Sequence, residues 1–303
     1  MEEKDNSTSL YRSSMPICSQ IFAKADSISP PIKNLLAWIF LTVAVFGIVI
    51  NSFLVLLIRK RRRFNKNQSI RLIMYLSLVD IYSCVFLNVA YICFLWHNRG
   101  TMPCSVIVGL YGVSRFAMYS TAYMAVMTGL DRFLHVTYLN EYSNIYTKLR
   151  FKLSLVAYFL VVIAVTTITT VTNARNGLGS AGKFTVPVNV RAVVVNIFMY
   201  LVSVRIMRQH KKANIKLSRT SQRVVRIAFV YLILFIILHG VLGMYQVLFI
   251  RFWKYTSDDE TSSVVWFFAF MLPSLNGIVN AAMFLVINRI FIKPIVRISS
   301  AKT

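Results

Sequence analysis

The sequence predicts an all-α membrane protein, a bundle of seven transmembrane helices followed by a short amphipathic helix on the membrane surface. Of its 303 residues, 57% are hydrophobic and only 15% are charged. Apolar runs of about 20 residues or more recur along the chain, the length a helix needs to cross a bilayer. Helices are expected because a lipid-exposed backbone must satisfy its hydrogen bonds internally.

Seven such runs follow one another, separated by short segments with charges, Gly or Pro. They cover residues 34–58, 70–95, 104–136, 150–172, 187–208, 222–250 and 262–287. The fifth is the least regular, because Asn189, Arg191 and Asn196 interrupt it.

Three regions are therefore expected along the chain. Residues 1–33 form a tail, residues 34–288 form the transmembrane domain, and residues 289–303 carry the surface helix and a short tail. In the last region Ile290, Phe291 and Ile295 alternate with basic residues, a pattern typical of a helix lying on a membrane. The tail has no apolar core of a cleaved signal peptide, so the first span is expected to direct insertion.

Basic residues set the orientation. The chain has 34 Lys and Arg against 10 Asp and Glu, and they gather in residues 59–63 and in the loop between spans five and six. Such loops stay in the cytosol, which predicts an extracellular N-terminus, a cytosolic C-terminus and a multi-pass protein of the plasma membrane. The same charges would contact anionic lipid heads. Because they separate apolar runs, nucleic-acid binding is not expected.

Four cysteines, Cys18, Cys84, Cys93 and Cys104, are too few for a disulfide scaffold and lack the paired spacing of a zinc site. Asn6 begins an Asn-Ser-Thr triplet on the predicted extracellular tail. That triplet makes Asn6 a candidate for glycosylation.

Polar side chains inside the spans include Asn51, Asp80, Asp131, Arg132, His239, Asn276 and Asn280. Each can be explained as a hydrogen bond between helices, worth about 1 kcal/mol. As a set, they favour a functional network, because such residues are costly in hydrocarbon and mark polar pathways.

The order of these residues along the chain, and their depth in the membrane, resemble the pattern of the rhodopsin-like family of G protein-coupled receptors. Asn51 matches the Asn of the family's first span, and Asp80 completes a Leu-x-x-x-Asp pattern in the second. The triplet at residues 131–133 is similar to Asp-Arg-Tyr, and residues 276–284 resemble the Asn-Pro-x-x-Tyr region. Four patterns on four spans in the right order carry the resemblance.

The chain also departs from the family. His239 occupies the place of a Trp in span six, and Val241 the place of the Pro that follows it. Ala281 replaces the Pro of the seventh-span pattern, so less kinked helices are expected. A divergent receptor is implied.

The resemblance implies signalling from an extracellular ligand to a heterotrimeric G protein through two bundle conformations. The residues implied in this switch are Asp131, Arg132, Phe133, Tyr200, Asn280 and Phe284, with Arg219, Arg223 and Arg226 as candidate G protein contacts. Tyr200 is the expected active-state partner of Arg132. No Asp or Glu occurs from 142 to 257, so no span-six acid can restrain Arg132, and ligand-free activity is expected.

The resemblance also supplies a sodium ion at Asp80. In the family the ion is held by this Asp and by groups that match Thr121, Asn276 and Asn280 here, with Asn51 close by. All are oxygen donors, as a hard cation requires. The alternative is structural hydrogen bonding alone.

Ligand identity is not readable, but span three carries no acid in its outer half, so small cationic amines are disfavoured. Candidate pocket residues are Tyr111, Ser114, Arg115, Met118, His239, Gln246, Trp266, Phe270 and Ser274. Arg115 lies about 100° from the face that holds Tyr111, Ser114 and Met118. It either snorkels or bonds between helices, or it binds an anionic ligand.

The disulfide usual in the family joins span three to the second outer loop and cannot form here, because no Cys follows Cys104. Cys18 is the first choice of partner for Cys104, Cys93 is the second, and a free thiol is the third.

Other seven-span classes fit less well. A retinal protein needs a Lys in span seven, which has Ser274 at the matching depth. An enzyme needs converging catalytic groups, and the four histidines lie in different segments. A transporter is the alternative function, although the chain shows neither an internal repeat nor paired broken spans.

Overall fold

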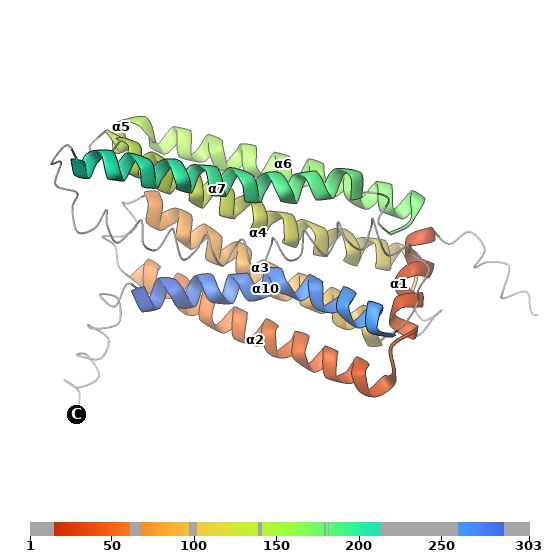
Figure 1. Cartoon of the computed structure of the whole chain (residues 1–303). Coiled ribbons are helices and arrows are strands. Elements are labelled where there is room, and N and C mark those ends of the chain that lie inside the picture. The colour runs from red at the N-terminus through yellow and green to blue at the C-terminus, as the bar shows by residue number, and fades with distance from the viewer. Residues whose placement is uncertain are drawn as a thin grey trace, which may run out of the picture.

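The structure is a computed structural model, and it describes residues 15–60, 68–96, 102–138, 141–178, 180, 182–212 and 260–287. In these ranges every regular element is a helix (Figure 1). The helices are α1 (Pro16–Asp26), α2 (Pro30–Lys60), α3 (Gln68–Trp96), α4 (Cys104–Tyr138), α5 (Tyr142–Ile145), α6 (Lys148–Asn176), α7 (Gly182–Lys212) and α10 (Glu260–Ile287). The all-helical prediction is confirmed for the described residues.

The long helices match six of the predicted spans to within a few residues at each end. The predicted span at 222–250 and the predicted surface helix lie outside the described residues. By length and composition, candidate membrane spans are Pro30–Lys60, Gln68–Trp96, Lys148–Asn176, Val190–Gln209 and Glu260–Val286. These five helices support a membrane protein.

Helix α4 is long enough to cross a bilayer, yet it is not among those five candidates. The reason is its position, since it contacts α3, α6, α7 and α10 and buries polar side chains such as Ser114, Ser120 and Thr128 among them. A helix enclosed by other helices can keep polar groups that a lipid-facing helix could not.

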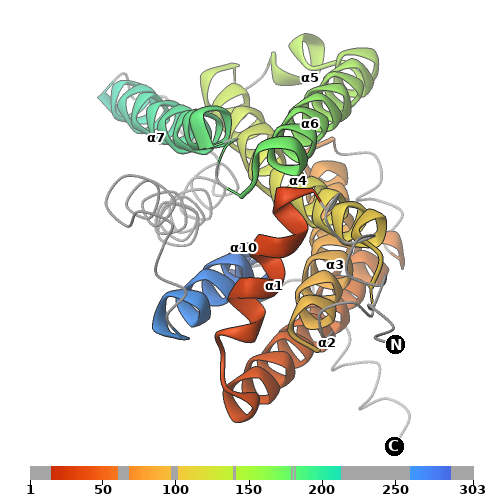
Figure 2. The same cartoon turned by 90° about the vertical axis from the view of Figure 1, so that its right-hand side faces the viewer.

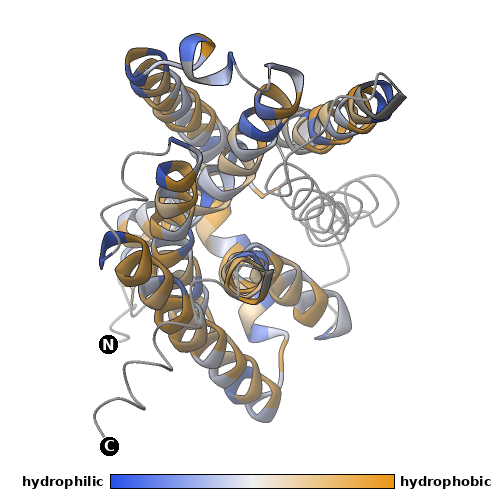
Figure 3. Ribbon diagram, turned by 90° about the vertical axis from the view of Figure 1, so that its left-hand side faces the viewer, coloured by the Kyte–Doolittle hydropathy of each residue, from blue (hydrophilic) through white to orange (hydrophobic). Residues whose placement is uncertain are grey.

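The outward faces of α2, α6 and α7 are apolar. Phe46 on α2, Leu160 on α6 and Phe198 on α7 are each more than 60% exposed. The helices are accordingly coloured as hydrophobic along much of their length in Figure 3. Exposed apolar surface of this extent is typical of a protein whose solvent is lipid.

Helix α1 was not anticipated within the predicted tail. It begins with Pro16 in its first turn and buries Ile17, Ile21 and Phe22. It lies across one end of the bundle, where it contacts α3, α4, α6 and α10 (Figure 2).

A disulfide joins Cys18 of α1 to Cys104 at the start of α4, with their Cα atoms 5.8 Å apart. This is the pairing placed first in the sequence analysis. Cys93, the second choice, is a free thiol, as is the buried Cys84. The other end of α1 is also held, since Ser27 Oγ donates to Ser263 Oγ of α10 at 2.7 Å.

The expectation of a less kinked seventh span stays a prediction for α10. It rested on Ala281, and Pro273 also lies inside this helix. A Pro inside a helix removes one backbone hydrogen bond and is a common origin of kinks.

Candidate functional site

A chain of buried polar groups runs through the centre of α2, α3 and α10. Asn51 on α2 is fully buried, and its Nδ2 donates to the Gly47 carbonyl at 3.0 Å and to the Gly277 carbonyl at 3.3 Å. Gly277 lies directly against Asp80 of α3, because a Cβ built on this glycine would lie 2.8 Å from the Asp80 Cβ. Asn51, Asp80 and Gly277 therefore meet at one level.

Asp80 is 1% exposed, and neither of its carboxylate oxygens forms a hydrogen bond of normal geometry within the described residues. The Asn280 side chain is close enough to interact with the carboxylate. Asn276 and Asn280, one helical turn apart on α10, each have an amide O and N without a hydrogen-bonding partner in the same part of the chain. Buried polar atoms are costly when unpaired, so this group calls for a ligand, water or an ion.

Two further contacts extend the chain of polar groups. Ser83 Oγ, one turn beyond Asp80, donates to the Ala117 carbonyl at 3.0 Å and shares a 2.8 Å hydrogen bond with Thr121 Oγ1. Asn88 Nδ2 donates to Ser274 Oγ at 3.1 Å. Ser83 and Asn88 were not predicted from the sequence. Both face other helices, but α3 has polar residues on more than one side, so hydrophobic periodicity does not show which of them point inward.

The residues around Asp80 fit a sodium ion. Asp80 Oδ1 and Oδ2, Asn51 Oδ1, Asn276 Oδ1 and Asn280 Oδ1 are all buried oxygens without a hydrogen-bonding partner in the described part. Thr121 is less suited, because its hydroxyl already bonds to Ser83 and to the Ala117 carbonyl. No group of three or more His, Cys, Asp or Glu side chains that could hold a metal gathers among the described residues.

Sodium is expected to stabilise the purified protein, whereas the same concentration of choline should not. At about ten times the dissociation constant, mass action contributes about 1.4 kcal/mol. Melting temperature is compared in the two salts for the intact chain and for Asp80→Asn, which keeps the shape and removes the charge. Identical melting of the intact chain in both salts would contradict the site.

The Asp131-Arg132-Phe133 triplet lies near the C-terminal end of α4, far along the helix from Cys104. Asp131 is 1% exposed, and its Oδ1 accepts hydrogen bonds from Ser69 Oγ of α3, at 3.1 Å, and from the Tyr142 hydroxyl of α5. Arg132 Nε lies 3.9 Å from Asp131 Oδ2, the long limit of an ion pair. Asp131 is thus held firmly by neutral donors and only loosely by Arg132.

Tyr142 lies in the short helix α5 between two long ones. Burial and the neighbouring Asp131 carboxylate raise the pKa of its hydroxyl, so it stays protonated and acts as a donor near neutral pH. Neither Ser69 nor Tyr142 was predicted from the sequence. The sequence signal that could have indicated Tyr142 is an aromatic residue in the loop shortly after Asp-Arg-Phe.

The remaining predicted switch residues are spread over three helices. Phe133 follows Arg132 on α4 and is half-buried, Tyr200 is half-buried on α7, and Phe284 is buried near the end of α10. The pairing of Arg132 with Tyr200 stays a prediction.

Arg115 lies inside the bundle, with 6% of its surface exposed. Its guanidinium carbon is 4.5 Å from the ring centroid of Tyr111 and 4.4 Å from that of Phe270 on α10. The long side chain thus reaches back to the face of Tyr111, although its Cα lies to one side. Snorkelling, one of the predicted alternatives, does not describe this burial.

Three of the other described pocket candidates, Tyr111, Met118 and Phe270, contact Arg115. Tyr111, Ser114, Met118, Trp266, Phe270 and Ser274 are all buried. Tyr91, which was not predicted, stacks on Phe270 with ring centroids 5.3 Å apart and contacts Trp266 edge to face. Together these side chains form an aromatic cluster around one cation.

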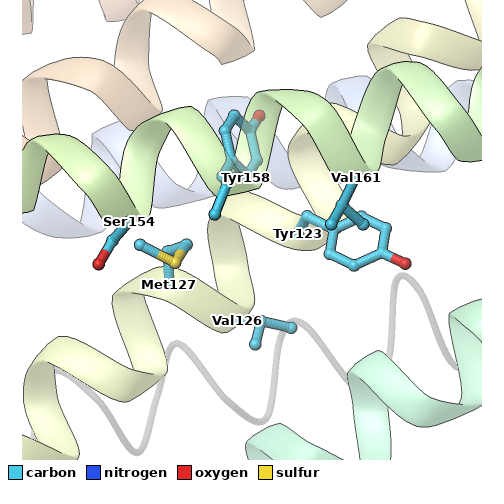
Figure 4. A pocket seen from close by; sticks show the side chains of 7 residues that line it. Tyr123, Val126, Met127, Ser154, Tyr158 and Val161 are labelled. Atoms are coloured by element: carbon cyan, nitrogen blue, oxygen red, sulfur yellow. The ribbon is translucent and has the colours of Figure 1, made fainter.

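A separate hollow of about 300 Å³ is formed by α4 and α6. It is lined by Tyr123, Val126, Met127, Ser154, Ala157, Tyr158 and Val161 (Figure 4). None of the predicted pocket residues lines it. Its lining is mostly apolar.

Several predicted site residues lie outside the described residues. These are Asn6, Arg219, Arg223, Arg226, His239 and Gln246.

The sequence matches no protein-family model, and a search of curated proteins finds no relative. The class of protein that the described residues define is an all-helical protein with five candidate membrane-spanning helices.

Proposed function

We propose that the protein is a receptor of the rhodopsin-like, G protein-coupled class, which passes the signal of an extracellular ligand to a cytosolic heterotrimeric G protein. In this proposal it lies in the plasma membrane with α1 outside and α5 in the cytosol. The observation that carries it is the meeting of Asn51, Asp80 and Asn280. They lie on three different helices, and each matches a polar position of the receptor resemblance.

The unpaired atoms in this centre support a two-state mechanism. A core with fully paired groups resists rearrangement, whereas the Asn276 and Asn280 amides have no hydrogen bond of normal geometry to break within the described residues when the helices move. A ligand that favours one arrangement would shift the populations of both.

The contacts of Asp131 support the proposal that the G protein binds at the end of the bundle that holds Arg132. Because Ser69 and Tyr142 hold its carboxylate, Arg132 can leave Asp131 without stranding a bare buried charge. The released guanidinium would be a fixed cation with several donors, suited to a partner entering at the α5 end.

We expect nucleotide exchange on G proteins by the purified, reconstituted chain without added ligand, because no acid from 142 to 257 can restrain Arg132. Arg132→Ala should reduce this exchange to the background rate. Arg150→Ala, which removes an exposed Arg bonded to the Ile145 carbonyl at the same end, should leave it unchanged.

Equal exchange by the intact chain and by Arg132→Ala would contradict the proposed switch. Absence of exchange on every G protein class, together with solute uptake by the reconstituted chain, would favour the seven-span transporter instead.

A further inference from the structure

Arg115 is a buried cation whose described surroundings carry no negative charge. Its Nε has no hydrogen-bonding partner there, and its Nη1 donates only to the Met118 sulfur, at 3.7 Å. The Tyr111 hydroxyl is the other nearby acceptor. A guanidinium has five N–H donors, so most of its capacity is unused by strong acceptors among the described residues.

No carboxylate of the described residues is among the groups that act on Arg115. Asp131 is bound by Ser69 and Tyr142, Glu260 accepts from the Ser29 backbone at 2.7 Å, and Asp26 pairs with Lys33. Asp80 packs against Gly277. The sequence has no Asp or Glu from 142 to 257, so α6, α7 and the stretch following α7 cannot supply one.

Two aromatic rings hold the guanidinium in place. The ring centroids of Tyr111 and Phe270 lie within 4.5 Å of its carbon, which compensates part of the charge but supplies no anionic acceptor to its N–H groups. Two hydrogen-bonding groups lie in the same region: the Tyr91 hydroxyl forms no hydrogen bond of normal geometry among the described residues, and the Ser114 side chain is close enough to interact with it. An anion could therefore receive donors from both Arg115 and Tyr91.

We propose that Arg115 is the anchor of a binding site for an organic anion, a carboxylate or phosphate joined to an apolar body. The anionic group would bond to Arg115 and Tyr91, and the apolar body would lie against Phe270 and Trp266. Met118, which is unbranched and adaptable, would turn aside to admit it. The inference rests on the proposed function, because this anion would be the ligand of that receptor.

The position of the site agrees with ligand binding from the α1 end. Arg115 is 11 residues beyond Cys104, the first residue of α4. At 1.5 Å per residue it lies about 16 Å inside the bundle. At this depth a charge is weakly screened, so an anion is strongly discriminated from a neutral molecule.

The test compares two acids with their uncharged amides on the purified full-length chain in a neutral detergent. Decanoate represents a lipid-derived anion and phenylacetate a soluble aromatic acid; decanamide and phenylacetamide have the same shapes without the charge. Dissociation constants are measured by calorimetry and melting temperatures by thermal unfolding. At least one acid should bind about tenfold or more tightly than its amide.

Arg115→Gln should abolish the preference for the acid, and Arg115→Lys should retain part of it because the charge remains. Arg175→Gln is the matched control, since Arg175 is an exposed Arg in the last turn of α6. A preference for decanoate alone indicates a lipid source, and a preference for phenylacetate alone indicates a soluble one.

Equal affinities of acid and amide for the intact chain, or a preference that survives in Arg115→Gln, would overturn the inference. So would a failure of all four probes to bind. Because binding is measured without G protein, Arg115-dependent binding in a chain that never stimulates nucleotide exchange would contradict the receptor function and not the anion site.

Discussion

Gly277→Ala is expected to lower the melting temperature of the purified protein by about 3–10 °C, from an overpacking cost of about 1–3 kcal/mol. The added Cβ would lie 2.8 Å from both the Cβ and the Cγ of Asp80. No side-chain rotation moves the Asp80 Cβ, so α3 and α10 must separate. Separation would also lengthen the bond from Asn51 to the Gly277 carbonyl.

Two other glycines serve as comparisons, because an added Cβ meets less resistance at each of them. At Gly47 the added Cβ would lie 2.2 Å from the Cys84 sulfur, which can rotate, so Gly47→Ala should cost less. At Gly109 a Cβ would meet nothing within 4 Å, and Gly109→Ala should stabilise α4 by about 0.5–1 kcal/mol. If Gly277→Ala melts like Gly109→Ala, the close packing of α10 on Asp80 is refuted.

Loss of the Cys18–Cys104 bond is the second large effect that we expect. Removing a native disulfide costs about 2–5 kcal/mol, and this one closes a loop with a sequence separation of 86. Cys18→Ser and Cys104→Ser should each lower the melting temperature by the same amount. The double variant should be no less stable than either single one, because both remove one shared interaction.

Cys93→Ser is the control, since Cys93 is a free, half-buried thiol. A mild reductant added to the intact chain should reproduce the loss seen in the single variants and should not change them further. Additive losses in the double variant would show that the two cysteines act separately.

Hydropathy predicted the long helices well because the bilayer demands both a minimum length and an apolar surface. The prediction missed α1, whose 11 residues are too few for a span and whose Ile17, Ile21 and Phe22 are buried by contact with distant helices. From sequence alone, such a segment looks like an unstructured tail, because the helices that bury it are distant in the chain.

The candidate site was predicted in part for a related reason. Asn51, Asp80 and Asn280 stand out as polar residues in apolar runs, and the structure brings them together. Ser69, Ser83 and Tyr142 do not stand out, because hydroxyls are common in helices and loops; only tertiary contacts assign their partners. For Arg115, helical spacing placed the Cα correctly but could not give the direction of a long side chain.

The two attachments of α1 limit how it can move. A disulfide fixes it near its start, and the bond between Ser27 and Ser263 holds its end where the chain enters α2. A segment fixed at both ends can bend or fray, but it cannot swing away as a free tail does. Passage through this end of the bundle would then be paced by local opening of α1, on the microsecond to second scale of such events, rather than by diffusion. Residence time, and not affinity alone, would be set by that helix.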